Sequence, residues 1–71
     1  MKEEEHKGCF IEGSAMGGPP FRGVATVRIS SHGKEQLVDA GMTEEEFATR
    51  EEAEAAGLEV ARRWVDQHST P

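Results

Sequence analysis

Residues 49–68 read TREEAEAAGLEVARRWVDQH, and we expect this segment to form a helix that packs on the rest of the chain. Thr49 and Glu52 have the spacing of a capping box, in which the threonine hydroxyl accepts from the Glu52 amide and the glutamate side chain reaches back to the Thr49 amide. Small and apolar residues then recur every three or four positions as one stripe: Ala53, Ala56, Gly57, Val60, Ala61, Trp64 and Val65. The pattern predicts a helix from about Arg50 to about His68 that frays before Pro71 and lies close to a sheet.

Residues 21–30 are the clearest strand, because apolar and polar side chains alternate along them. A glycine-containing turn joins this segment to a further strand over residues 35–39. A two-residue loop would pair Val27 with Val38, and a three-residue loop would pair Val27 with Leu37, so the register stays open. The alternation predicts an inner face toward the helix, made of Phe21, Ala25, Val27 and Ile29.

A shorter strand is expected at residues 8–12, with Cys9 and Ile11 facing the helix and Phe10 facing away. Residues 13–20 contain three glycines and two prolines, which favours a flexible connection too long for a tight hairpin. As the single cysteine, Cys9 excludes an internal disulfide. We expect it to be a small buried apolar residue, with a reactive thiol as the alternative.

These elements predict an α+β fold: a three-stranded antiparallel β-meander followed by one C-terminal α-helix packed on one sheet face, β-β-β-α. We expect a single small domain over residues 1–71, with a disordered tail at 1–7, the sheet at 8–39 and the helix at 50–68. Residues 43–46 are expected to form one helical turn.

The composition allows only a small core, because eight of the hydrophobic residues are alanines and 17 larger ones remain in a chain of 71. No apolar run is long enough for a signal peptide or a membrane span, so we expect a cytoplasmic protein without membrane contact. Of the net charge of −6, residues 43–71 carry −5 and residues 8–42 are neutral. Most of the acidic excess therefore belongs to the helix and its entry, where it complements the helix dipole.

No motif for catalysis, a cofactor or a metal is present. The glycine-rich segment lacks the Gly-Lys-Ser/Thr of a phosphate-binding loop, and its two prolines remove amide donors. The three histidines, His6, His32 and His68, lie in a tail, a turn and a helix end, without the spacing that metal ligands need. We therefore expect a non-enzymatic protein without cofactors or metals.

The run FATREEAEAA at residues 47–56, with ARRWVD at 61–66, stands behind three short strands and resembles small uncharacterised bacterial β-β-β-α proteins. The resemblance implies the fold, and that group has no established activity to transfer. The element order is also similar to the C-terminal part of double-stranded-RNA-binding domains and to the sheet-and-helix half of HicB-type antitoxins. Such likeness of fold says little about function.

The sheet face turned away from the helix is the candidate interaction surface. It combines an aromatic ring, a valine and two arginines, although an ordinary solvated face would account for them equally well. We expect a protein–protein interaction module or a homodimer that uses this face or an edge strand. The alternatives are binding of RNA or single-stranded DNA, which the net charge disfavours, and antitoxin-like neutralisation of a partner protein. The residues of the surface are Phe10, Arg22, Val24, Thr26 and Arg28.

Overall fold

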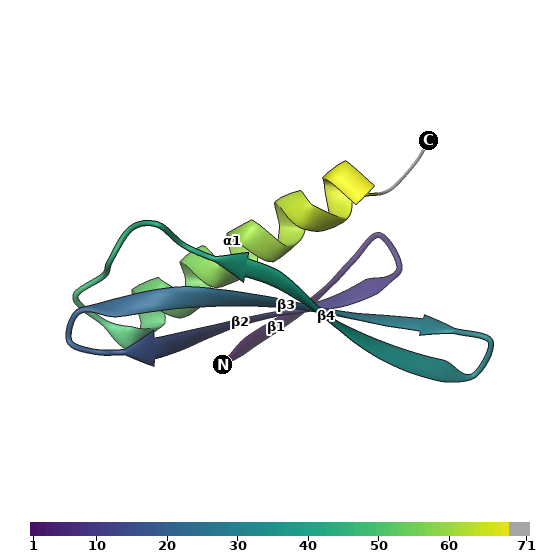
Figure 1. Ribbon diagram of the computed structural model, residues 1–71, viewed down its shortest axis with the longest axis horizontal. Helices are drawn as coiled ribbons and strands as arrows, with labels where there is room; N and C mark the ends of the chain where they lie inside the picture. The colour runs from purple at the N-terminus through teal and green to yellow at the C-terminus, as the bar shows by residue number, and fades with distance from the viewer. Residues whose placement is uncertain (69–71) are drawn as a thin grey trace.

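The computed structural model describes residues 1–68, which form four strands and one helix. The elements are β1 (Lys2–His6), β2 (Cys9–Gly17), β3 (Phe21–Ser31), β4 (Lys34–Met42) and α1 (Arg50–His68). The strands form one antiparallel sheet in the order β1-β2-β3-β4, and α1 packs on β2 and β3 (Figure 1). The α+β fold with an antiparallel sheet and one C-terminal helix is confirmed. The three-stranded meander is wrong, because a further strand precedes the expected ones.

That further strand is β1, at the segment that we expected to be a disordered tail. It pairs with β2 over its whole length. Its inward positions carry polar side chains that reach α1: Glu4 Oε1 lies 2.9 Å from Arg62 Nη2, and His6 Nε2 lies 2.8 Å from Asp66 Oδ1. β1 therefore lacks the alternation of apolar and polar residues seen in β3, because its inward side chains form ion pairs with the helix instead of packing in the core.

β2 extends well beyond the strand expected at residues 8–12. Most of the glycine-rich segment at 13–20 belongs to this strand, and only residues 18–20 connect it to β3. Gly13 lies directly under α1, where a Cβ atom would overlap the main chain of Glu54 and Leu58. We interpreted the glycines of this segment as a sign of flexibility, but Gly13 instead allows close contact between helix and sheet.

The β3–β4 hairpin has the shorter of the two loops considered. Val27 pairs with Val38, and the two loop residues, His32 and Gly33, have φ angles of 51° and 79°. Two consecutive residues with positive φ are typical of the tight turns that match strand twist. The register shifts between Ala25 and Thr26, so that Ala40 of β4 has no partner and forms a β-bulge.

The connection from β4 to α1 follows the edge of β3, and residues 43–46 do not form the expected helical turn. The Thr43 amide donates to the Gly23 carbonyl at 2.8 Å, and the Gly23 amide donates to the Thr43 hydroxyl at 2.9 Å. Further along, Phe21 and Phe47 exchange two main-chain hydrogen bonds of 2.8 and 2.7 Å. These bonds continue the pairing of β3 after β4 has ended.

α1 has the bounds that the sequence predicts, and the Glu52 amide donates to the Thr49 hydroxyl at 3.2 Å. The second arm of the capping box differs from the expectation, because the Glu52 carboxylate accepts from the Thr49 hydroxyl at 3.0 Å instead of from its amide. The fraying expected before Pro71 falls outside the described residues.

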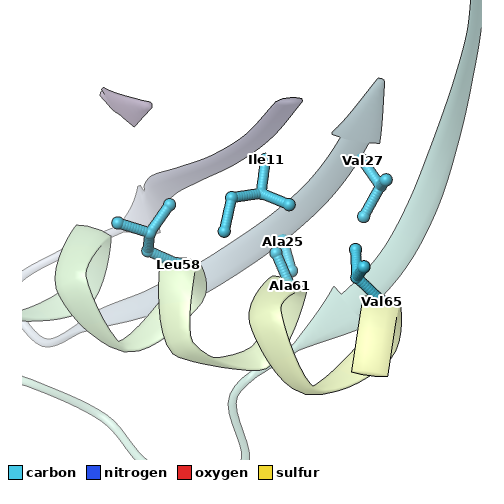
Figure 2. Packing of buried hydrophobic residues seen from close by; sticks show 6 residues of the cluster. All are labelled: Ile11, Ala25, Val27, Leu58, Ala61 and Val65. Carbon is cyan, nitrogen blue, oxygen red and sulfur yellow. The ribbon is translucent and has the colours of Figure 1, made fainter. Parts of the chain in front are cut away.

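The core lies between α1 and the inner face of β2 and β3, as Figure 2 shows. Among the described residues its largest fully buried side chains are Ile11, Val27 and Val65. The small residues of the helix bring it close to the sheet, as expected: a Cβ atom on Gly57 would lie 2.6 Å from the Val24 carbonyl oxygen. The cluster consists of Ile11, Ala25, Val27, Leu58, Ala61 and Val65.

Candidate interaction surface

The structure places all five candidate residues on the sheet face that α1 leaves uncovered, here called the open face. Directly paired residues on antiparallel strands point to the same side of a sheet. Phe10 pairs with Arg28, so the aromatic ring and one guanidinium group are neighbours. Thr26 and Val24 follow in the next two rows of the sheet, and Arg22 lies at its far end. Arg22 is exposed, whereas Val24, Thr26 and Arg28 are half-buried.

Three further apolar side chains lie on the open face or at its border and were missed from the sequence. Leu37 pairs with Arg28 and is 67% exposed, Met16 pairs with Arg22 and is 49% exposed, and Met42 ends β4 beside Val24. Leu37 points outward only in the register with the two-residue loop. The sequence did not decide between the two registers, so it could not place Leu37 on this face. Together with Phe10, which is 46% exposed, these side chains make the open face more apolar than the five candidates alone.

The charges of the open face are mixed, with an acidic excess. Arg28 Nη2 lies 2.6 Å from Glu12 Oε1, so these two side chains form an ion pair on this face. Glu12 also stands opposite Glu3 on β1, and Thr26 stands opposite Asp39 on β4. A phosphate group approaching Arg28 would therefore meet a guanidinium already bound to a carboxylate.

The opposite side of β1 holds the strand against α1 through ion pairs. A hydrogen bond from the Arg62 guanidinium lowers the pKa of Glu4 below its usual value, and the same contact raises the pKa of Arg62. Hydrogen bonds from His6 and then Lys7 lower the pKa of Asp66. These groups are bound to one another at the surface, which indicates a structural role for them.

The histidines and the cysteine considered as ligands or nucleophiles do not form a common site among the described residues. Residues 1–68 contain no group of three or more His, Cys, Asp or Glu side chains that could hold a metal ion. His6 contacts Asp66, whereas the ring of His68 stacks on Trp64 with their centroids 4.0 Å apart. Cys9 is half-buried against the core, and the reactivity of its thiol stays a prediction.

Within residues 1–68, no helix combines the length and the apolar character needed to cross a membrane. No family model, curated protein sequence or solved structure matches this chain. The resemblance to small bacterial β-β-β-α proteins therefore remains an expectation from the sequence.

Proposed function

We propose that this chain is a non-enzymatic interaction module that forms a homodimer through its open face. The observation that supports the proposal is the group of exposed large apolar side chains on that face: Phe10, Met16 and Leu37, with Met42 at its border. Single exposed apolar residues are ordinary, but several on one sheet face are typical of a contact surface.

The size of the core supports self-association. Three large side chains are fully buried among the described residues, in a chain of 71. Chains of this length commonly need a metal, disulfides or oligomerisation to supplement their core. Phe10 is 46% and Leu37 67% exposed, so covering the exposed remainder would add roughly 1–2 kcal/mol for each of them.

A second copy is the occupant that best fits the size and charge of the open face. Strands of nine residues are roughly 30 Å long, and four strands about 4.8 Å apart are roughly 15–20 Å wide. The flat area of the face is therefore roughly 450–600 Å², near the lower end of the ~600–1,000 Å² that each partner contributes to a standard interface. The face carries Arg22 as well as Glu3 and Glu5, so two copies can bring opposite charges together.

The two edges of the sheet are less suitable for pairing with another chain. The edge strand β1 consists of charged residues and a histidine, which disfavours pairing of two such edges. The other edge strand, β4, is interrupted by the bulge at Ala40. We therefore assign the contact to the open face.

Sedimentation velocity over roughly 1 µM to 1 mM tests the proposal. We expect the wild-type chain to change from monomer to dimer within this range, and the double variant Phe10→Ser with Leu37→Ser to dimerise at least tenfold more weakly. Ala55→Ser is the control, because Ala55 is exposed on the helix. Circular dichroism checks that both variants keep the fold.

A wild-type chain that stays monomeric at the highest concentration contradicts the homodimer. That result would favour antitoxin-like neutralisation of a different protein, which uses the same face with another occupant. Equal dimerisation of the double variant and the wild type would show that the contact lies elsewhere. Nucleic-acid binding is the weaker alternative, because Arg28 is already paired with Glu12 and carboxylates surround it.

A further inference from the structure

Two hollows lie along the flank of α1 that faces β4 and the β4–α1 connection. The larger is a hollow of about 620 Å³ between the connection and the helix residues Ala56, Glu59, Val60 and Arg63. A smaller hollow of about 210 Å³ continues along the helix toward Trp64 and shares Val60 and Arg63 with the first. The two hollows therefore adjoin along the helix at Val60 and Arg63, and together they are called the groove.

The groove exists because the sheet covers only part of the apolar stripe of α1. Residues such as Gly57, Ala61 and Val65 are buried against β2 and β3. Ala56 and Val60, which belong to the same stripe in the sequence, are only half-buried and line the groove. On its other side the groove is lined by Met42 and Phe47, so that apolar side chains stand on both walls among polar and charged ones.

The wall opposite the helix is held in place by hydrogen bonds. Thr43 is fixed to Gly23 by bonds of 2.8 and 2.9 Å, and its hydroxyl donates to the Glu45 carbonyl at 2.9 Å. At the other end of the connection, Phe47 is bound to Phe21 by two main-chain bonds. The groove is therefore formed in the free chain, as is usual for ligand sites.

The charges around these apolar side chains are mainly negative. Glu44, Glu45 and Glu59 contribute three carboxylates to the lining, against the single guanidinium of Arg63. Glu59 is partly neutralised by Arg62, whose Nη1 lies 2.6 Å from its carboxylate. Within the described part of the chain, neither Glu44 nor Glu45 takes part in an ion pair.

We infer that this groove binds a peptide segment of another protein that carries apolar anchor side chains flanked by lysine or arginine. The apolar side chains of the two walls contact the anchors, and Glu44 and Glu45 attract the basic flanks by charge complementarity. A phosphorylated or acidic segment would meet like charges at the rim. The inference does not depend on the proposed homodimer, since the groove and the open face have only Met42 at their common border.

Selection of random twelve-residue peptides displayed on phage, with the full chain as bait, provides the probe. We expect enriched peptides to share two or more large apolar residues and a net positive charge. Fluorescence anisotropy with the most enriched peptide then measures the dissociation constant for each variant at low and high salt.

Two matched pairs of variants locate the binding. Ala56→Arg fills the groove and is expected to weaken binding at least tenfold, whereas Ala55→Arg, at the exposed neighbouring position, should change it less than twofold.

The double variant Glu44→Gln with Glu45→Gln removes rim charge from an exposed connection without touching the core. We expect it to weaken binding about threefold to tenfold at low salt and to have little effect at high salt. Its control, Glu35→Gln with Glu51→Gln, removes the same charge away from the groove and should leave binding unchanged.

Failure to enrich peptides, or enrichment of acidic ones, contradicts the inference. Equal binding by the two arginine variants contradicts it as well. A peptide that is lost with Phe10→Ser but retained with Ala56→Arg binds the open face, and this result would refute the groove while leaving the homodimer to its own test.

Discussion

At the scale of single residues, the contact between helix and sheet depends on glycines that leave no room for a methyl group. Alanine normally stabilises a helix interior by about 1 kcal/mol relative to glycine. At Gly57, however, a Cβ atom would lie 2.6 Å from the Val24 carbonyl oxygen and 2.9 Å from the Val24 nitrogen. Both atoms are main chain, so the helix itself would have to move away from the sheet.

We expect Gly57→Ala to lower the free energy of unfolding by about 1–3 kcal/mol, because overpacking outweighs the gain in helix propensity. The control is the reverse exchange on the exposed side, Ala55→Gly, which should lower it by about 1 kcal/mol through propensity alone. Urea denaturation followed by circular dichroism measures both. A more stable Gly57→Ala variant would mean that α1 lies further from β3 than the structure shows.

At the scale of elements, the predictable parts of the fold are those whose signals are local. The cap at Thr49, the helical periodicity behind it and the turn at Gly33 each occupy a few neighbouring residues, and the sequence locates them correctly. β1 carries no such local signal, because Glu4 gains its partner, Arg62, from 58 residues further along the chain. A tertiary contact of this kind makes a charged segment into a strand.

The same distinction applies to the open face. Alternation within a single strand was sufficient to find Phe10 and the outward residues of β3. Leu37 depends on the pairing between two strands, and the sequence left that register open. Gly13 belonged to a segment interpreted as flexible, because the helix that requires a glycine there is far away in sequence.

The attachment of β1 to α1 predicts a dependence of stability on pH. The folded chain has a lowered pKa at Glu4, relative to the usual 4.5, so the unfolded chain binds more protons in acid. The contribution of this carboxylate is therefore present above about pH 4.5 and is lost as the pH falls through the folded pKa. Glu4→Gln should be less stable than wild type at pH 7, and the two should converge in acid. Glu35→Gln, at an exposed position on the hairpin, should follow the wild-type profile.

Urea midpoints measured from about pH 2.5 to pH 7 give these stability profiles. This range includes the interval in which Glu4 becomes protonated and the wild type loses stability. A shallower acid slope for Glu4→Gln is the expected result. If Glu4→Gln and Glu35→Gln give the same profile, the contact with Arg62 does not hold β1 in solution.

At the scale of the whole molecule, a small core and an apolar open face connect stability with assembly. If two copies cover their open faces, dimer formation stabilises the folded state by mass action. Well above the dissociation constant, free monomer rises as the square root of total concentration, so each tenfold increase stabilises a chain by about 0.7 kcal/mol. For a domain of this size, this corresponds to about 3–6 °C in Tm.

We therefore expect the Tm of the wild-type chain to rise with protein concentration, and that of Phe10→Ser with Leu37→Ser to begin rising only at concentrations at least tenfold higher. Phe10 is 46% and Leu37 67% exposed, so at the lowest concentrations, where the wild type is also monomeric, the double variant should melt only somewhat below the wild type. Thermal unfolding by calorimetry at high concentration and by circular dichroism at low concentration covers the range. A wild-type Tm that is independent of concentration would indicate that the chain is stable as a monomer and that its open face is available to a different protein.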